Sequence, residues 1–449
     1  MGRRCGLAVC LAVLLASGAA QAQQVRLTPE NLLKLGHVAL AQRDLMAALA
    51  YAQALVARDP DDVSAQILLA RVQRDLGRLD EAEVAARLAW RGADQPAERF
   101  GAALVSAQVA SSKGQRTRAQ VWLRRAVENA PNDQARQVAI TDFGYVRSRN
   151  PLSLKVDVAV QPSSNVNNGS SRQIMEFLGI PFELSGDAQA LSGVTTSLGV
   201  SGRYKLGDGS TVLRFAVTGQ AVALSSDAKD QAPDATGADY AYLGLEVGAE
   251  KRFLGAIGPV ALTPALTLGT NFYGGSALSD YLRLDLTADR ALGTRTSGKI
   301  TLSGERILRK DDRSRSSASL GLSGSVTTSL TNRDQLRLTF GTKRSRSDWH
   351  DAHYLALSAG VDWQKASPVL GTAVAARLGV ETRDFDTSPF SLDGRQDIRL
   401  SAGVSVTLRQ IDYMGFSPMI EFSASDTRSN IALHDSRDLG VGISIRSNF

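Results

Sequence analysis

Cysteine is almost absent from this sequence, and both cysteines lie within its first ten residues. Cys5 and Cys10 belong to a segment with a positively charged start, an apolar core over residues 7–16 and an Ala20-Gln21-Ala22 cleavage site. These are the marks of a secretory signal peptide. We therefore expect residues 1–22 to be removed, which leaves a mature chain without a thiol, a disulfide or a cysteine metal site.

Long apolar runs are also missing after residue 22. A transmembrane helix needs about 18 consecutive apolar residues, so we expect none. The net charge is only +6, and no basic block is interleaved with aromatic residues, so nothing indicates nucleic-acid binding. What the chain has in abundance is glycine, with 40 residues, and a regular alternation of polar and apolar positions. Short membrane strands have this composition.

Residues 23–150 have the apolar period of helices instead. Small residues recur 34 positions apart, as in the pairs Gly36 with Ala70 and Ala48 with Ala82. A 34-residue repeat with small residues at fixed places is typical of tetratricopeptide helical hairpins. We predict about three repeats and a final helix near residues 133–145, which together form a short periplasmic solenoid.

Polar side chains on the first helix of each predicted repeat would line the concave surface of this solenoid. The candidates are His37, Arg71, Arg74 and Gln108. Because solenoids use such surfaces for binding, we expect a groove for a client peptide. The alternative is a solvated face on a spacer domain.

From about Pro151 onward, apolar residues occupy every second position, which is the period of strands with one apolar face. The pattern predicts fourteen strands, near residues 152–160, 192–204, 211–222, 239–250, 260–271, 278–289, 296–305, 314–326, 334–342, 354–363, 371–382, 396–408, 417–426 and 438–449. Most are long enough to cross a bilayer at a tilt, and their number is even. We predict a 14-stranded antiparallel transmembrane β-barrel over residues 151–449.

The predicted connections alternate in length. The odd-numbered set contains the long ones, about 161–191, 223–238, 343–353, 383–395 and 427–437, and the even-numbered set is uniformly short. Outer-membrane barrels combine long outer loops with short periplasmic turns, so we expect the helical part to lie in the periplasm. The terminal Phe449 is expected to be the insertion signal that the barrel-assembly machinery recognises.

The first predicted outer loop is unusually apolar, with Ile174, Met175, Phe177, Ile180 and Phe182 among its residues. Three interpretations remain open. The loop folds into the lumen as a plug, contacts a client, or packs on the rim of the barrel.

No arrangement of residues supports catalysis, a metal or a cofactor. His350 and His353 are three residues apart in a predicted outer loop, and His434-Asp435 lies in another, but neither pair adds an ordered base to a nucleophile. We therefore expect no enzyme. Basic residues in the predicted outer loops suggest pairing with lipopolysaccharide phosphates; they are Arg306, Arg309, Lys310, Arg313, Arg315, Lys343, Arg344 and Arg346.

Three short segments resemble the surface lipoprotein assembly modulators. They are Pro162-Ser163-Ser164-Asn165-Val166-Asn167-Asn168, Gly415-Phe416-Ser417-Pro418 and Ser429-Asn430-Ile431. The resemblance implies tetratricopeptide repeats followed by a 14-stranded barrel, in agreement with the periodicities, and none of the three segments is a catalytic signature.

The resemblance also implies a function: a translocator that helps lipoproteins, or soluble secreted proteins, across the outer membrane to the cell surface. The client would be captured by the helical domain and passed through or along the barrel. One alternative is a passive channel, either a porin or an exopolysaccharide exporter with a repeat scaffold. Another is an adhesive surface protein that uses its long first outer loop.

Overall fold

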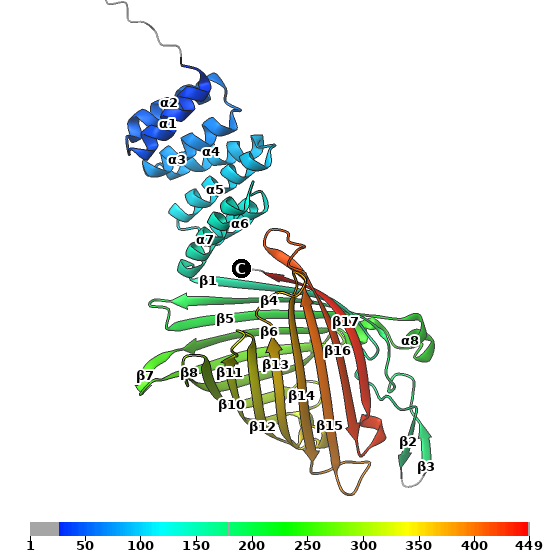
Figure 1. Ribbon diagram of the computed structural model, residues 1–449. Helices are drawn as coiled ribbons and strands as arrows, with labels where there is room; N and C mark the ends of the chain where they lie inside the picture. Colours follow the sequence, from blue (N-terminus) through cyan, green and yellow to red (C-terminus); the bar gives the residue numbers. More distant parts are fainter. Residues whose placement is uncertain (1–26, 178–179, 448–449) are drawn as a thin grey trace, which may run out of the picture. The chain divides into compact units, whose positions relative to one another are not determined.

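The structure is a computed structural model that describes residues 27–177 and 180–447. The chain divides into a helical unit that ends at Ala139 and a strand-rich unit that begins at Ile140 (Figure 1). The expected signal peptide and Phe449 lie outside the described residues. None of the described helices is both long and apolar enough to cross a membrane.

Helices follow one another as antiparallel hairpins along the first part of the described chain. They are α1 (Pro29–Ala41), α2 (Leu45–Arg58), α3 (Val63–Asp75), α4 (Leu79–Gly92), α5 (Pro96–Ser112), α6 (Arg116–Glu128) and α7 (Asp133–Arg149). The side chains of Thr28, Asp44 and Asp62 cap α1, α2 and α3 by accepting a backbone N–H three residues on, which satisfies a group that the helix itself leaves unpaired.

Small residues allow these helices to approach closely. Ala48, Ala70 and Ala82 are fully buried, and a Cβ placed on Gly36 of α1 would lie 2.5 Å from Leu68 Cδ2 of α3. These are the positions at which the 34-residue repeat places small residues, and the turns after α3 and α5 use Gly77 and Gly114 at positive φ. The predicted helical-hairpin repeat is confirmed.

The strand-rich unit is a closed antiparallel barrel of fourteen strands. They are β1 (Leu152–Ser163), β4 (Gly193–Leu206), β5 (Thr211–Leu224), β6 (Tyr242–Lys251), β8 (Val260–Tyr273), β9 (Ser276–Ala291), β10 (Thr296–Arg309), β11 (Ser317–Ser329), β12 (Gln335–Ser347), β13 (Tyr354–Gln364), β14 (Ala373–Phe385), β15 (Arg395–Thr407), β16 (Phe416–Ser429) and β17 (Ser436–Ser447). Each pairs with its neighbours in chain order, and β1 closes the circle by pairing with β17. The short β7 (Phe253–Ile257) continues β6 as a hairpin with the start of β8. All fourteen predicted strands are present.

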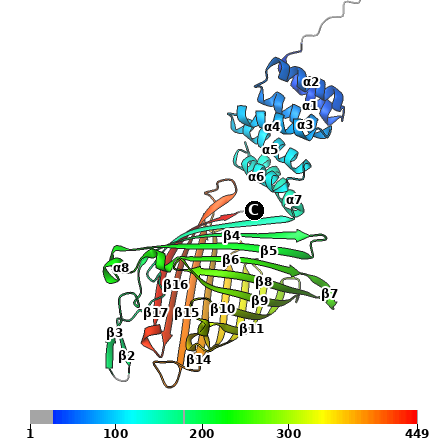
Figure 2. The ribbon, with the colours of Figure 1, turned by 180° about the vertical axis from the view of Figure 1, so that it is seen from behind.

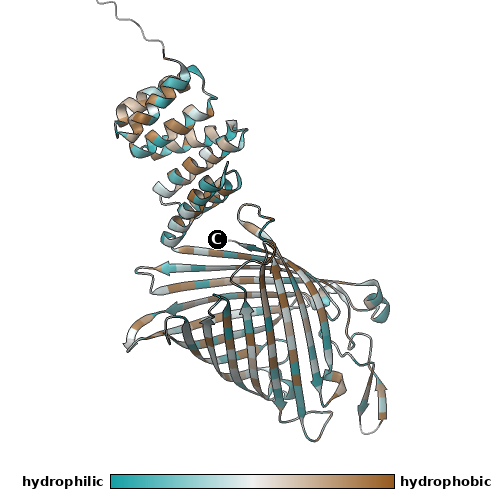
Figure 3. Cartoon of the chain, viewed as in Figure 1, coloured by the Kyte–Doolittle hydropathy of each residue, from teal (hydrophilic) through white to brown (hydrophobic). Residues whose placement is uncertain are grey.

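Apolar and polar residues alternate along the strands of the barrel wall (Figure 3). The outward face carries exposed apolar residues, such as Leu284, Leu302 and Leu322. The lumen carries polar and paired charged residues; Arg283 Nη1 lies 3.8 Å from Glu305 Oε2, and Lys343 Nζ lies 3.4 Å from Glu305 Oε1. An apolar outer band around a polar interior is the arrangement of a barrel in a bilayer.

The two rims of the barrel differ. At the proximal rim, where β1 begins and β17 ends, the connections are short, such as 207–210 and 292–295. At the distal rim, the first two connections are long and contain the hairpin β2 (Ile174–Phe177) with β3 (Ile180–Glu183) and the helix α8 (Ser226–Gln231). In both ribbon views, this hairpin extends away from the barrel, so it is not a lumen plug (Figures 1 and 2).

One part of the loop prediction is wrong. The strands β10 and β12 extend further than predicted, so that Arg306, Arg309, Lys343, Arg344 and Arg346 lie in strands rather than in outer loops. Polar residues continue the alternation there past the apolar band, where hydrophobicity no longer reports it. The connection between β8 and β9 at the distal rim is a two-residue turn, Gly274-Gly275, with both residues at positive φ.

The barrel geometry predicts that an arginine at two neighbouring positions of β11 lowers the stability of the barrel by different amounts. Leu322 faces outward and Ser323 faces the lumen. We expect Leu322→Arg to lower the free energy of unfolding in bilayers by about 2–4 kcal/mol, because the charge enters the hydrocarbon. The matched control Ser323→Arg is expected to change it by less than half as much. Unfolding in urea, followed by tryptophan fluorescence in lipid vesicles, measures both; equal effects would contradict the assigned faces.

Candidate functional site

The four predicted groove residues lie on the first helices of successive hairpins. His37 is on α1, Arg71 and Arg74 are on α3, and Gln108 is on α5. Arg74 Nη1 donates to Gln108 Oε1 at 2.6 Å, and Arg74 Nη2 lies 2.6 Å from Asp75 Oδ1. The structure therefore links α3 to α5 through two of the predicted residues.

The charges along this line influence one another. Partial burial and the positive charge of Arg71 lower the pKa of His37. Burial and the neighbouring Arg74 likewise lower the pKa of Arg71, although Asp75 opposes this. Binding of a client there remains a prediction.

A second candidate site is the seam, by which we mean the junction of β1 with β17. On its other side β1 pairs with β4 along its whole length, and β17 does the same with β16. Across the seam, the described residues pair only at Ala159 with Ser444, Val160 with Ile443 and Ser163 with Gly440. The first and last strands are thus joined over the distal half of β1.

Pro162 interrupts even this short ladder. Ser164 N–H donates to Leu439 O at 3.1 Å, so the backbone groups of even-numbered residues of β1 point toward β17, since successive residues alternate. Pro162 is one of these residues and has no N–H to donate. The seam therefore lacks a backbone hydrogen bond at a position where the family motif begins.

Side chains replace the missing bond on the lumen side. Gln161 Nε2 of β1 reaches across β17 and donates to Ser423 Oγ of β16 at 3.1 Å. It passes over Gly440, where any Cβ would overlap Gln161 Nε2. Ser163 Oγ donates to Asp438 Oδ1 at 2.7 Å. We call these contacts, together with those of Asn165, the clasp.

Asn165 is the most buried member of the clasp, with 5% of its surface exposed. Its Nδ2 donates to Gly169 O at 2.9 Å and lies 3.2 Å from Ser436 Oγ and 3.3 Å from Arg437 O. One asparagine side chain thus ties the segment after β1 to the start of β17.

The other asparagines of this motif shape the loop itself. Asn167 Nδ2 donates to the carbonyls of Asp187 and Gln189, and its Oδ1 accepts from Leu191 N–H. Asn168 has a φ of 54°, a left-handed conformation that asparagine tolerates better than most residues. The Asn-rich motif is therefore explained as a loop scaffold at the distal end of the seam.

The Ser429-Asn430-Ile431 motif lies at the same end. Ser429 N–H donates to Asp435 Oδ1 at 2.8 Å, and Asn430 Nδ2 donates to Gly394 O at 3.1 Å. Asp435 also accepts from Arg172 Nε at 2.9 Å, and Ile431 is buried. Asp435 thus connects the Ser429-Asn430-Ile431 motif to Arg172, in the connection that follows β1.

The third motif lies at the opposite rim. Gly415 has a φ of 78°, and its N–H donates to Asp412 Oδ1 at 3.1 Å. Phe416 and Pro418 follow it as the first residues of β16, opposite Ser447 and Ile445 of β17. Its residues shape the proximal turn that leads into β16.

The histidines form structural contacts in the distal loops. His434 lies 2.9 Å from Arg395 Nη1 through its Nε2, and burial together with that arginine lowers the pKa of His434. His353 Nε2 lies 3.1 Å from Asp386 Oδ2. Within the described residues, no group of three or more metal-ligating side chains gathers.

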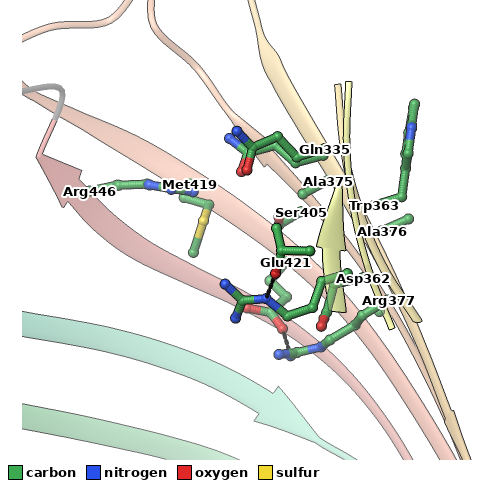
Figure 4. A pocket seen from close by; sticks show the side chains of 14 residues that line it. Gln335, Asp362, Trp363, Ala375, Ala376, Arg377, Ser405, Met419, Glu421 and Arg446 are labelled. Atoms are coloured by element: carbon green, nitrogen blue, oxygen red, sulfur yellow. Dashed lines mark hydrogen bonds and ion pairs between the residues drawn. The ribbon is translucent and has the colours of Figure 1, made fainter. Parts of the chain in front are cut away.

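The lumen contains a polar cavity of about 350 Å³ near the proximal rim (Figure 4). Arg377 pairs with Glu421 across it, and Asp362, Gln335 and Arg446 also line it. The cavity suits water and polar groups.

Sequence reasoning missed Gln161, Ser423 and Asp438 of the clasp. Their partners lie more than 260 residues away in sequence. The available signal was the pair Gly440 and Gly442 at lumen-facing positions of the last strand, since glycine within a strand often marks a close approach by another group.

Comparison with known proteins gives one family. Residues 314–449 match the family model described as surface lipoprotein assembly modifier, which confirms the resemblance for this part of the barrel. A search of the curated proteins finds no match.

Solved structures resemble each unit separately. The type III secretion translocator chaperone SycD of Yersinia enterocolitica is 18% identical, with 27% of this chain and 93% of SycD covered and a TM-score of 0.25. A BenF-like porin from Pseudomonas fluorescens Pf-5 is 9% identical, with 66% and 98% covered and a TM-score of 0.36. A bacterial polysaccharide outer membrane secretin is 7% identical, with 66% and 98% covered and a TM-score of 0.34. These likenesses concern the fold alone.

The clasp predicts a specific loss of barrel stability. Asn165→Ala removes hydrogen bonds to buried carbonyl groups, and we expect the free energy of unfolding to fall by about 2 kcal/mol. The matched control is Asn168→Gly, since glycine adopts the positive φ of that position without strain. The measurement is the temperature at which the purified barrel loses its folded mobility on a detergent gel. An unchanged transition for Asn165→Ala would show that the clasp contributes nothing.

Proposed function

We propose that this chain is an outer-membrane factor that helps lipoproteins reach the cell surface. The observation that carries the proposal is the match of residues 314–449 to the surface lipoprotein assembly modifier family. That match includes β11 to β17, and hence the strand that closes the barrel and one half of the distal motif cluster. The family match thus falls on the part of the structure where the seam is built.

The proposed orientation places the proximal rim in the periplasm. Short turns lie at the proximal rim and the longest connections at the distal rim, and outer-membrane barrels direct their long loops outward. The helical segment precedes Leu152, which begins β1 at the proximal rim. This orientation therefore puts the helical unit on the periplasmic side, where a newly exported client arrives.

Capture of the client is assigned to the line of His37, Arg71, Arg74 and Gln108. Arginine side chains donate to carboxylates and to backbone carbonyls, both of which an extended polypeptide offers. The groups are held in place by the bond between Arg74 and Gln108. An extended client segment with acidic residues fits this surface best.

A passive channel for small solutes or exopolysaccharide is the second candidate. It is favoured by the polar lumen cavity of about 350 Å³ and by a second one of about 300 Å³ lined by Arg283, Glu305 and Glu381. Such a lumen would pass polar solutes even if no protein used it.

Surface proteolysis separates the two functions. Intact cells with and without this protein are treated with protease, and the released lipoproteins are compared. We expect at least one lipoprotein to become protease-resistant in the deletion strain, and a chain lacking residues 23–150 to reproduce the loss. An unchanged set of lipoproteins, with altered uptake or export of a solute or glycan, would favour the channel.

The groove assignment predicts that removing positive charge from α3 reduces surface exposure of the lipoprotein more than removing the same charge from α4. The double substitution Arg71→Gln/Arg74→Gln is expected to reduce surface exposure of the dependent lipoprotein about tenfold or more, with the barrel level unchanged. The matched control is Arg87→Gln/Arg91→Gln on α4, which removes the same charge elsewhere on the helical unit. Equal defects in both variants would rule out a specific groove, and protease-protected lipoprotein on whole cells is the measurement.

Lipopolysaccharide is the second proposed partner. Arg344 and Arg346 share the outward parity of Leu338 and Phe340 on β12 and lie at its distal end. Lipopolysaccharide phosphates in the outer leaflet would meet these guanidinium groups, which bind phosphate through paired N–H donors. Contact with the barrel-assembly machinery through Phe449 also remains a prediction.

Lipopolysaccharide binding predicts a ligand-dependent change in thermal stability. We expect added lipopolysaccharide to raise the unfolding temperature of the barrel, and Arg344→Gln/Arg346→Gln to remove at least half of that increase. The control Lys343→Gln/Arg383→Gln removes two lumen-facing charges and should leave the increase intact. A full increase in the Arg344 and Arg346 variant would contradict the contact.

A further inference from the structure

The seam is paired at one end and separated at the other. The register that pairs Ala159 with Ser444 would next pair Val158 with Ile445 and then Asp157 with Arg446. Neither pair forms, although all four residues belong to described strands. Among the described residues, β1 and β17 are therefore paired from Ala159 to the distal end of β1 and unpaired at Asp157 and Val158.

This separation leaves a strand edge on β1. The backbone groups of its even-numbered residues point toward β17, as Ser164 N–H does, so those of Val156 and the N–H of Val158 face the opening. On the other side, the same strand is fully paired with β4. An unpaired edge of a well-formed strand is a template for another strand, and an unpaired backbone group in hydrocarbon costs several kcal/mol.

We propose that the proximal half of the seam binds an extended segment of the client by adding it as a strand to the free edge of β1. The inference rests on the proposed function and names where the barrel contacts the client. Main-chain hydrogen bonds provide the affinity in such strand addition, which makes it tolerant of sequence. The occupant is a polypeptide, because the edge presents alternating N–H and C=O groups, for which a lipid acyl chain has no partners.

The two faces of the edge define the kind of segment that fits. Val156 and Val158 face outward and are exposed, while Lys155 and Asp157 have the lumen-facing parity and pair with each other at 2.7 Å. A strand added there continues the barrel wall. Its residues should therefore alternate, apolar toward the membrane and polar or charged toward the lumen.

The clasp sets the distal limit of this opening. The bond between Gln161 and Ser423 crosses β17, and Ser163 bonds to Asp438 beyond it. Both lie distal to Ala159, so separation of the strands stops there while the distal rim stays closed. The clasp therefore confines the accepted strand to the part of β1 that precedes Ala159, where Asp157 and Val158 do not pair with the described residues of β17.

A pair of cysteine variants tests whether the seam is open. The mature chain is expected to have no cysteine of its own, so every free thiol or disulfide that is detected belongs to the added pair. Ala159→Cys/Ser444→Cys joins directly opposed residues in the paired half, where the separation of about 4.5 Å between Cα atoms suits a disulfide. Asp157→Cys/Arg446→Cys probes the next equivalent pair in the open half.

The purified full-length variants are treated with copper phenanthroline, and free thiols are counted by maleimide labelling. We expect the Ala159/Ser444 variant to oxidise almost completely and the Asp157/Arg446 variant at least fivefold less. Equal oxidation would mean that the seam is closed throughout and would overturn the inference.

A second experiment identifies the occupant. Val156→Cys on the edge and Leu213→Cys, an outward residue of the fully paired β5, are each combined with single cysteines along the lipoprotein that depends on this chain. We expect disulfides from Val156→Cys at alternate client positions, the period of a strand, and none from Leu213→Cys. Crosslinks without that period, or none at all, would overturn strand addition.

The outcomes separate the inference from the function on which it rests. If deletion of the chain leaves every surface lipoprotein in place, the proposed function and the occupant are both overturned. If the deletion removes a lipoprotein from the surface but Val156→Cys remains uncrosslinked, the function stands and the seam inference alone is wrong.

Discussion

The closure of the sheet between its first and last strands is the constraint on which the rest of the barrel depends. Inside a bilayer each backbone N–H and C=O needs a partner within the protein, so an open sheet cannot remain there. Thirteen of the fourteen junctions form between strands that are close in sequence, and most have ladders of ten or more pairs. The junction of β1 with β17 joins the two ends of the barrel, and the residues that the structure describes form only three pairs there. Its stability must therefore come in large part from side chains.

The motif residues supply those side chains, which explains their unusual composition. Pro162 removes a backbone donor from the seam, and Gln161 and Ser163 on either side of it donate to Ser423 and Asp438 instead. Asparagine suits the next positions because its amide both donates and accepts, as Asn165 does with Gly169. A seam held by side chains can be strong at one end and absent at the other. A continuous backbone ladder would distribute its strength evenly along the strands.

Much of the architecture could be predicted from the sequence because periodicity directly reports which face of an element is buried. The two-residue period located every strand, and the 34-residue spacing of Gly36 and Ala48 with their counterparts located the helical hairpins. The clasp could not be found in this way, since the contact between Gln161 and Ser423 depends on which strands meet at closure and in which register. The polar ends of β10 and β12 were also misplaced, because Lys343 and Arg344 continue a strand without continuing its hydrophobic signal. The contact of Arg74 with Gln108 follows from the helical repeat, which fixes their spacing, whereas client binding has no sequence signal of its own and stays a prediction.

The motif segments lie near the seam and are not spread around the barrel wall. Residues that only maintain a barrel wall need the right polarity and little else, and the outward face accordingly carries exposed Leu, Val and Ile at alternate positions. The segments that resemble the family are different. The motif at Asn165 contacts the start of β17, and the motif at Ser429 contacts Asp435 just before it. The third shapes the turn at Gly415 that leads into β16, the strand beside β17. If the barrel served only as a pore, specific side chains would be expected around the lumen cavity between Arg377 and Glu421, not along one line of the wall. Their concentration near the seam indicates that the contacts between the first and last strands need specific side chains, whereas the rest of the wall needs only alternating polarity.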